Sequence, residues 1–545
     1  MAADAVLAAP HEDGAATVTT TASTDGATGR PPVIAVTLAI LVFVAAAVTP
    51  DHYWDEYFYI FSASRHPLAT LLALERPLSD GIIPNGFFSG KLGFVAMLEG
   101  LVAMTGTGQI GLAVMRSVFL LLVMGLAAAS WLLLQALVDR RAALETAILL
   151  LLLPLSLYLG FKTLSEAPSL LVSTLGGWQF ARAVRAPAPG SRWRHVGFAA
   201  AGLGLGIVMR VTSVLFAFGL IGAVLVLRPG GATWRRIAAD AAVALGIAAA
   251  LSGCLYLAVV GTPFDRFVGL VASVTGRTPG PAVALYAVAL FGQLFLPLVA
   301  ISIWPPHGRE VRAALLWLAI AMLPFLVTAR YVEPRFFYTG LVPLAVMAHA
   351  GIDRVVTRVR TSSRVMAGAC VLALVVLVNR LAFSALMPYE LRESDYSSLI
   401  GDVRSQHPSA SYVTPWLSDF CYLAVAFPEE RVVLSMSRTY GTGRVFDTAE
   451  FRQWIGEQNY VGSARDLHAL GEPRVYVGWE YSPTVVALDR LLRPFGFAYL
   501  DDPGRRARLL NHLTPSWIWT DPAHRLEPVA TRGGYRAFAI RESGE

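Results

Sequence analysis

Two carboxylates stand side by side directly after the first long apolar run of the sequence. Asp55 and Glu56 fall in the stretch Trp54-Asp55-Glu56-Tyr57. Neighbouring side chains point in different directions on any regular backbone, so one carboxylate can accept a proton while the other holds a cation. The same stretch would also fit a solvated loop whose aromatic residues anchor at a membrane interface. The residues alone leave both interpretations open.

Charged residues border apolar runs at three further places. Ser165 and Glu166 suit the first turn of a helix, because a serine hydroxyl can cap it and a carboxylate complements its positive end. Arg210 lies between two apolar runs, where a charge without an anionic partner or ligand is costly. Glu333 and Arg335 flank a proline that favours a helix start. The segment contains two arginines, Arg330 and Arg335. Neither is needed to start a helix, which favours a function for them.

Lysine is rare in this chain. Of the 44 lysines and arginines only two are lysines, Lys91 and Lys162. The excess of arginine and alanine is typical of a bacterium with a GC-rich genome. Against that bias, the two remaining lysines are candidates for a functional role.

The composition is that of a membrane protein. Hydrophobic residues make up 55% of the 545 residues and charged residues 15%, where a soluble protein would have roughly a quarter. The net charge of +6 does not indicate nucleic-acid binding, because the basic residues lie in short loops between apolar runs.

About eleven apolar runs are predicted to cross the membrane as helices. The first run, 33–49, begins too far from the start of the sequence for a signal peptide, and it lacks a small-residue cleavage site. The pair 195–209 and 211–227 is predicted to form two helices hinged near Arg210. The runs are 33–49, 111–137, 142–159, 165–183, 195–209, 211–227, 238–260, 282–304, 312–329, 337–353 and 366–386.

Arginines in every second loop predict the orientation. By the positive-inside rule these loops are cytoplasmic, which places the N-terminus inside and the C-terminus outside. The predicted fold class is a polytopic α-helical membrane protein with a C-terminal extracytoplasmic α/β domain. Residues 1–30 form a disordered cytoplasmic tail, 31–387 the transmembrane domain with a long outer loop at 50–110, and 388–545 the α/β domain.

The α/β domain is predicted from alternating patterns. Helical patterns cover 395–406, 448–457 and 483–493, and short apolar strands cover 411–414, 432–434 and 475–478. Asp419 and its aromatic neighbours could contact a sugar or could belong to a packed core. The sequence leaves these two alternatives open.

The charged segments all fall on the outer side in this topology. Carboxylates, two lysines and several arginines at one depth suit an anionic ligand such as a phosphate, beside a carboxylate base. The three cysteines form no metal-binding pattern. Arginines can neutralise a monophosphate without a metal, so no cofactor is predicted and a divalent metal stays open.

These segments, in this order, resemble the GT-C superfamily of membrane glycosyltransferases. The resemblance is greatest to the branch of aminoarabinose transferases and protein O-mannosyltransferases, glycosyltransferase family 39. The matching motifs are YWDEYFYI around Asp55, Ser-Gly-Lys-Leu at 89–92, Val-Met-Arg-Ser at 114–117, KTLSEAPSLL from Lys162, GLGLGIVMRVTSVL at 202–215 and VEPRFFYTGLVPLAVMA from Val332.

The resemblance implies an inverting transferase. It would move a sugar from a polyprenyl-phosphate carrier to a hydroxyl of a cell-envelope lipid, glycan or protein, outside the bacterial inner membrane. Asp55 would be the general base, with Glu56 a second candidate. The cations implied for the donor phosphate are Lys91, Arg210 and Arg335, followed by Arg116 and Lys162. The residues implied for the acceptor or for positioning are Glu166, Glu333 and Tyr57.

A transporter or lipid flippase is the alternative, since it would also hold charges at a membrane edge. Many transporters contain inverted repeats and interrupted helices. The sequence shows no inverted repeat of spans, and its large outer loop and tail suit acceptor binding better than a permeation path. The transferase is therefore the favoured interpretation.

Overall fold

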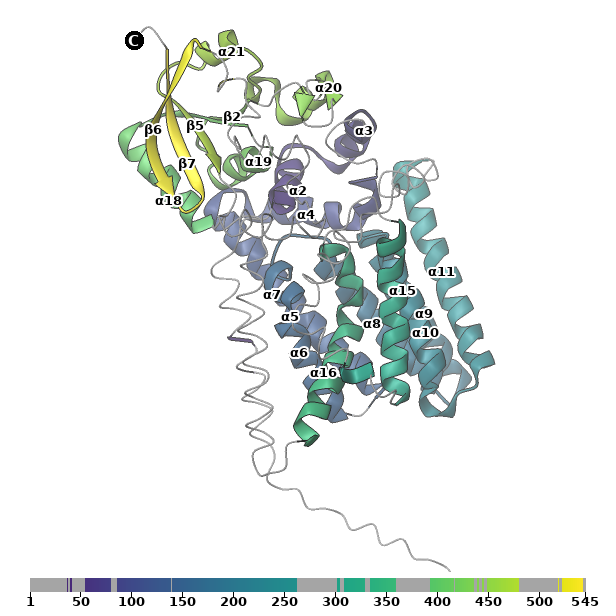
Figure 1. The fold of residues 1–545 in the computed structure, drawn as a ribbon. Helices are drawn as coiled ribbons and strands as arrows, with labels where there is room; N and C mark the ends of the chain where they lie inside the picture. Colours follow the sequence, from purple (N-terminus) through teal and green to yellow (C-terminus); the bar gives the residue numbers. More distant parts are fainter. Residues whose placement is uncertain are drawn as a thin grey trace, which may run out of the picture.

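The computed structural model describes most of the helical bundle and the α/β layer that covers one end of it (Figure 1). The predicted spans at 33–49, 282–304 and 366–386, and the domain boundaries near 30 and 387, lie largely or wholly outside the described residues. The described residues are 37, 40–41, 54–79, 86–138, 140–261, 301–303, 308–328, 334–358, 393–415, 417–435, 439–440, 444–445, 448–479, 518 and 522–542.

The helices of the bundle run roughly side by side (Figure 1). Two of those described, α5 and α11, are long and apolar enough to cross a membrane. Leucines on the outer face of α11 are exposed, which is typical of contact with lipid. The helices are α5 (Gly108–Gln135), α6 (Arg140–Leu152), α7 (Pro154–Leu159), α8 (Glu166–Arg185), α9 (Pro189–Met209), α10 (Ser213–Leu227), α11 (Trp234–Val260), α15 (Arg309–Thr328) and α16 (Leu341–Arg358).

The run predicted as one helix over 142–159 is two helices. α6 ends at Leu152, and Leu153 is extended with φ −63° and ψ 144°. Pro154 opens α7, because a residue before proline avoids the helical region and proline has no N–H to donate to the preceding turn. The chain therefore bends just before the segment that carries Lys162.

The predicted hinge at Arg210 is present. Arg210 is extended with φ −162° and ψ 117°, between the end of α9 and the start of α10. The N–H of Val211 donates to the carbonyl of Gly90 at 3.0 Å. This bond attaches the turn η1 (Ser89–Lys91), which carries Lys91, to the hinge.

Helices α8 and α9 approach closely where glycines face each other. A Cβ built on Gly202 would lie 2.7 Å from the Cα of Gly176, and one on Gly176 would lie 2.7 Å from the N of Leu203. Only residues without a side chain allow the backbones to pack at this distance.

Gly202→Ala is expected to lower the free energy of unfolding by about 1–3 kcal/mol, because the helices must separate to admit the methyl group. Gly197→Ala on the same helix is the matched control, since nothing lies within 4 Å of its Cβ position. Alanine there should be neutral or slightly stabilising. Thermal unfolding in detergent compares the two, and equal midpoints would contradict the close packing.

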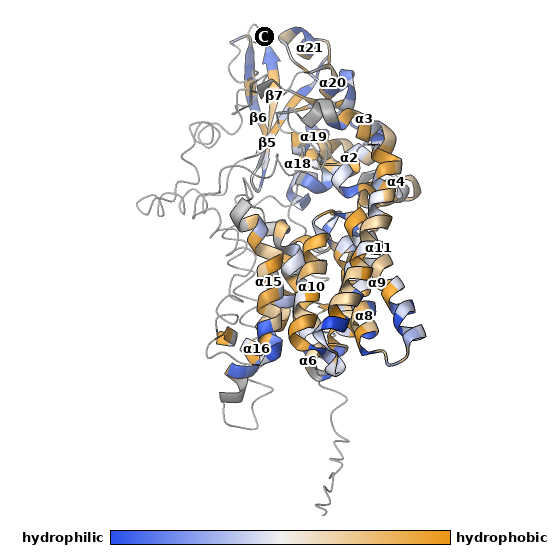
Figure 2. Ribbon diagram, turned by 90° about the vertical axis from the view of Figure 1, so that its right-hand side faces the viewer, coloured by the Kyte–Doolittle hydropathy of each residue, from blue (hydrophilic) through white to orange (hydrophobic). Residues whose placement is uncertain are grey.

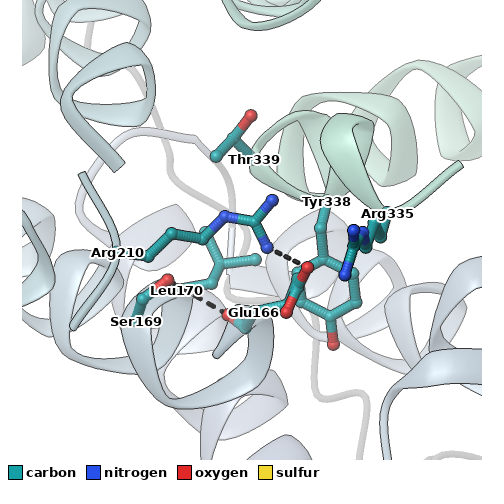
Figure 3. Close-up of a pocket in the computed structure, with 7 residues that line it drawn as sticks. All are labelled: Glu166, Ser169, Leu170, Arg210, Arg335, Tyr338 and Thr339. Atoms are coloured by element: carbon teal, nitrogen blue, oxygen red, sulfur yellow. Dashed lines mark hydrogen bonds and ion pairs between the residues drawn. The ribbon is translucent and has the colours of Figure 1, made fainter. Parts of the chain in front are cut away.

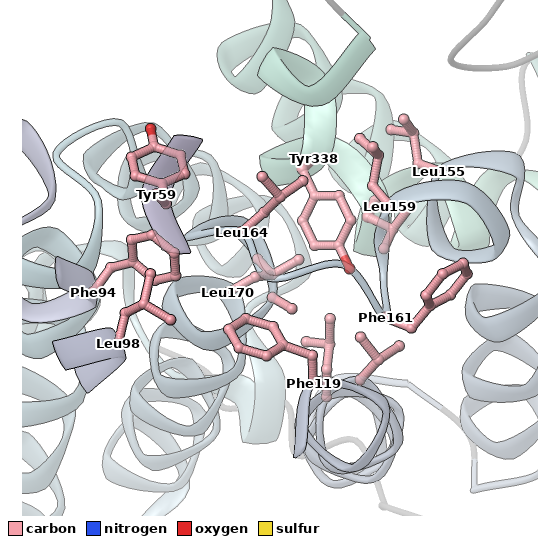
Figure 4. Close-up of a cluster of buried hydrophobic side chains, with 14 of the residues drawn as sticks. Tyr59, Phe94, Leu98, Phe119, Leu155, Leu159, Phe161, Leu164, Leu170 and Tyr338 are labelled. Carbon is pink, nitrogen blue, oxygen red and sulfur yellow. The ribbon is translucent and has the colours of Figure 1, made fainter. Parts of the chain in front are cut away.

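Four shorter elements lie between the bundle and the sheet: α2 (Trp54–Arg65), α3 (Leu68–Ser79), η1 and α4 (Leu92–Thr105) (Figure 1). All four fall within the long outer loop predicted at 50–110. Figure 2 shows hydrophobic residues through the bundle and more hydrophilic ones in the sheet above it. Beneath α2, buried aromatic and aliphatic side chains such as Tyr59, Phe94 and Phe119 form a core that excludes water (Figure 4).

The α/β layer contains a five-stranded sheet of order β2-β1-β5-β7-β6. Strands β2, β1 and β5 are parallel, and β7 and β6 add an antiparallel hairpin. The three predicted strands are β1 (Ser411–Thr414), β2 (Val432–Leu434) and β5 (Arg474–Trp479), and the hairpin is β6 (His524–Arg532) and β7 (Tyr535–Glu542). A separate pair is β3 (Thr439–Tyr440) and β4 (Arg444–Val445).

Helices α18 (Glu393–Gln406) and α19 (Leu417–Ala426) join the layer to the elements below, and α19 packs on α2. Two predicted helical patterns, 395–406 and 448–457, correspond to α18 and to α20 (Ala449–Ile455), while 483–493 lies outside the described residues. The other short helices are α21 (Ala464–His468), η2 (Pro229–Gly231), η3 (Pro334–Gly340) and η4 (Glu457–Asn459).

Asp419 belongs to the packed core of this layer. It is 0% exposed, and its carboxylate interacts electrostatically with the hydroxyls of Tyr396 and Tyr535. Burial raises the pKa of the Asp419 carboxyl well above its usual range. Of the two alternatives for this segment, the structure supports the packed core.

Asp419→Asn is expected to stabilise the protein at neutral pH. Because the folded-state pKa of Asp419 is raised above its ordinary value of 3.8, the folded state binds more protons than the unfolded state, and stability falls as the pH rises above about 4. The gain from asparagine should therefore be large at about pH 7 and shrink toward about pH 4 in thermal unfolding. A gain that is equal at both pH values would contradict this explanation.

The control is Asp402→Asn on α18. A hydrogen bond from Arg532 holds the pKa of Asp402 below its ordinary value. The ionised carboxylate of Asp402 therefore stabilises the folded state at neutral pH, whereas that of Asp419 destabilises it. Asp402→Asn should accordingly give no gain in stability at neutral pH.

Candidate active site

An ion pair joins the first turn of α2 to η3. Arg335 donates through Nη1 to Oδ2 of Asp55. The Asp55 side chain is 15% exposed and that of Arg335 8%. These residues are 280 positions apart in the sequence. The fold thus places the predicted base against one of the predicted phosphate ligands.

A second ion pair joins α8 to the hinge between α9 and α10. Arg210 Nη1 contacts Oε1 of Glu166, and its Nε donates to Thr212 Oγ1 at 2.8 Å. Ser165 directly precedes α8, but its hydroxyl makes no capping bond to that helix. It donates instead to Oε2 of Glu166 at 3.2 Å. The predicted anionic partner of Arg210 is therefore Glu166.

A small pocket lies beside the pair Glu166–Arg210, and Arg335 also lines it (Figure 3). Among the described residues, the buried hydroxyls of Tyr338 and Thr339 have no hydrogen-bond partner. Burying a hydroxyl without a partner is costly, which makes these two groups candidate contacts for a polar ligand. The lining residues are Glu166, Ser169, Leu170, Arg210, Arg335, Tyr338 and Thr339.

Glu56 belongs to a neighbouring cluster with Arg116. Arg116 donates from Nε to Oε1 of Glu56 at 3.3 Å and from Nη2 to Oε2 at 3.1 Å. The N–H of Thr163 also donates to Oε1, at 3.0 Å. Burial acts to raise the pKa of Glu56, but the charges of Arg116 and Lys162 and these hydrogen bonds hold it below its ordinary value. Glu56 is therefore an ionised, fully buried carboxylate whose oxygens are engaged.

The two lysines occupy different surroundings. Lys91 Nζ donates to the hydroxyl of Tyr59 and lies 4.6 Å and 4.4 Å from the ring centres of Tyr59 and Phe87. Aromatic faces attract a cation, and the two rings hold the ammonium group in place. Lys162 is fully buried beside Glu56.

Comparison with known proteins identifies the fold. The family described as dolichyl-phosphate-mannose-protein mannosyltransferase matches residues 94–256. The crystal structure of ArnT from Cupriavidus metallidurans bound to undecaprenyl phosphate is similar with a TM-score of 0.53 and 14% identity, over 93% of this chain and 97% of that one. The chain shares the fold of this structure.

The apo structure of ArnT from Cupriavidus metallidurans is also similar to this chain, with a TM-score of 0.52 and 13% identity over 93% of this chain and 97% of that one. A comparison with curated proteins gives no match. At these identities the structural similarity establishes the shared fold, which is that of a polytopic membrane protein.

Most of the predicted site residues of this chain meet at one end of its bundle. Arg335, Glu166 and Arg210 line the pocket, Asp55 pairs with Arg335, and Glu56, Tyr57, Arg116 and Lys162 form a neighbouring cluster. Lys91 adjoins the hinge through its own turn. Glu333 lies outside the described residues. Among the residues that are described, no three His, Cys, Asp or Glu side chains form a group that could hold a metal ion.

Several residues at the site were missed from the sequence. Tyr338 and Thr339 follow the predicted Glu-Pro-Arg segment, so helical spacing from Arg335 could have suggested them. Glu393 contacts Arg116 from a distant part of the chain. No local pattern marks Glu393 as a site residue, because an acidic residue in the first turn of a helix is ordinary.

Proposed function

We propose that this protein is a GT-C inverting glycosyltransferase that moves a sugar from a polyprenyl-phosphate carrier to an acceptor hydroxyl outside the inner membrane. The observation that carries the proposal is the pocket lined by Arg335, Arg210 and Glu166, in which Arg335 pairs with Asp55 and Arg210 with Glu166. The pocket combines two arginines with two hydroxyls that have no partner in the described structure, and the proposed base Asp55 adjoins it through Arg335. The mannosyltransferase description of the matching family supports the same reaction class.

The reaction needs a base for the acceptor hydroxyl and cations for the leaving phosphate. Asp55 accepts the proton of the acceptor hydroxyl as its oxygen bonds to the anomeric carbon. The bond from that carbon to the phosphate oxygen breaks, and the carrier leaves as polyprenyl phosphate. Arg335 and Arg210 stabilise the charge that develops on the leaving phosphate. Attack opposite to the leaving group inverts the configuration.

The remaining predicted residues take supporting roles in this proposal. Lys91 contributes a third cation to the donor phosphate from the η1 turn. The charges of Arg116 and Lys162 act on Glu56, which makes them weaker candidates for the phosphate. Glu166 holds Arg210, and Glu333 remains a proposed acceptor residue. A divalent metal at this site would have to replace an arginine as the partner of Asp55 or Glu166.

The alternative function, lipid or sugar transport, makes a different prediction. The test incubates purified protein in vesicles with labelled polyprenyl-monophosphate hexoses and pentoses and with envelope lipid, glycan and protein acceptors. We expect the donor to be consumed, with release of polyprenyl phosphate. Movement of intact donor across the vesicle membrane without consumption would favour the transporter.

Lys91→Gln is expected to raise the donor KM about tenfold or more, because it removes a charge-assisted contact to the phosphate. Lys91→Arg keeps the charge and should lose less. Steady-state rates at varied donor concentration provide the measurement, with the exposed Glu429→Gln as a control variant. An unchanged KM in Lys91→Gln would remove Lys91 from the phosphate site.

A further inference from the structure

Glu393 is buried where the α/β layer meets α2 and α5. It is the first described residue of α18 and 7% exposed. Its Oε2 accepts from Arg116 Nη1 at 2.5 Å, and its Oε1 accepts from Arg116 Nη2 and from the hydroxyl of Tyr57. A two-pronged pairing between a carboxylate and a guanidinium fixes the plane of both groups.

Arg116 therefore lies between two carboxylates from different parts of the chain. One is Glu393 of the α/β layer, and the other is Glu56, next to Asp55 in the first turn of α2. Tyr57 links the two sides, since its hydroxyl accepts from Arg116 Nη2 at 2.7 Å and donates to Glu393. Its ring also packs edge to face on Tyr422 of α19, with centroids 4.6 Å apart.

Glu393 adds a second negative charge to the cluster around Arg116. Among the described residues, Glu56 experiences the positive charges of both Arg116 and Lys162, and Glu393 pairs with Arg116 from the other side. A buried guanidinium that loses one partner is expected to reorient toward other acceptors. Arg116 would then no longer hold Glu56 in its present place, and the turn that carries Asp55 would lose an anchor.

We propose that Glu393 is a positioning residue of the active site, which holds Arg116 and thereby Glu56 and the first turn of α2 that carries Asp55. The catalytic part of this inference rests on the proposed transferase function. The α/β layer then serves as part of the catalytic scaffold, because it supplies one of the two carboxylates that orient Arg116.

The test compares Glu393→Gln and Glu393→Asp with Glu429→Gln in the full-length protein. Glu429 is 59% exposed in its side chain and pairs with Arg404 on the same α18, so it controls for loss of a carboxylate in this layer. For Glu393→Gln we expect kcat to fall about tenfold, while the Kd for unlabelled polyprenyl phosphate changes less than about threefold. Glu393→Asp keeps the charge and should restore part of kcat.

A double-mutant cycle tests the path through Arg116. In a Glu56→Gln background, Glu393→Gln should lower kcat little further, because the carboxylate that Arg116 orients is already absent. Additive losses, a loss in Kd equal to that in kcat, or a kcat like that of Glu429→Gln would overturn the proposal.

Hydrogen exchange separates this inference from the proposed function, since it needs no activity. Glu393→Gln should speed amide exchange in α2 while exchange in β1 and β5 stays unchanged. If α2 exchanges as in the wild type, Glu393 does not position it, whatever the reaction. If Glu393→Gln unfolds the protein, Tyr57→Phe provides the same comparison, because it removes only the linking hydroxyl. Unchanged exchange in α2 of Tyr57→Phe would then overturn the proposal.

Discussion

Asp55→Asn is expected to lower the rate of sugar transfer at least about a hundredfold, because asparagine cannot accept the proton of the acceptor hydroxyl. Binding of polyprenyl phosphate should persist or become tighter, since Arg335 loses a negatively charged partner and becomes more available to the phosphate. Single-turnover transfer from labelled donor and equilibrium binding of the unlabelled carrier measure the two effects separately.

Glu56→Gln is the matched comparison for this prediction. Glu56 is adjacent in sequence, but it is fully buried and engaged by Arg116 and Thr163. We expect a smaller loss of transfer from this variant. If Asp55→Asn kept full activity and Glu56→Gln had none, the base would be Glu56.

Breaking the pair Glu166–Arg210 is expected to have the largest effect on stability. Each single variant, Glu166→Gln or Arg210→Gln, leaves a buried charge without its partner, which costs about 3–5 kcal/mol. The double variant leaves neither charge and should be destabilised by less than the sum of the two. Donor turnover should be lost in all three, because the phosphate loses Arg210 or its orientation. Thermal unfolding and transfer assays provide the two measurements.

A second ion pair controls for the general effect of losing a charge. Arg192 donates from Nε to Asp240 at 2.8 Å near the opposite end of α9, about 27 Å along the helix from Arg210. Arg192→Gln should lower stability but leave the donor KM unchanged. Additive losses in the Glu166 and Arg210 cycle would show that these two residues do not act as a pair.

The sequence indicates which charged residues need partners where they lie beside an apolar run, because an unpaired charge is costly there. For Arg210 an anionic partner was predicted, and the structure identifies Glu166. The pairing of Asp55 with Arg335 could not be derived, since it depends on how α2 and η3 meet across 280 positions. Local patterns specify which residues need partners, and the fold decides which partners they receive.

The helices and strands also divide into features that local sequence patterns predict and features that depend on the whole fold. The break at Leu153 follows from the proline at 154, although hydropathy alone suggested a continuous helix. The strand β6 was missed because it contains Pro528, which argues against a strand inside a sheet. β6 is an edge strand in the order β2-β1-β5-β7-β6, and its register shifts between Pro528 and Ala530, so the proline is tolerated there.

The ion pair between Asp55 and Arg335 has a consequence for the kinetic mechanism. While Arg335 holds the carboxylate, a donated hydrogen bond occupies Oδ2 of Asp55. A donor phosphate that draws Arg335 toward itself would release this oxygen to accept the proton of the acceptor hydroxyl. The donor would therefore have to be bound when the acceptor is deprotonated, so we expect that an acceptor alone forms no productive complex.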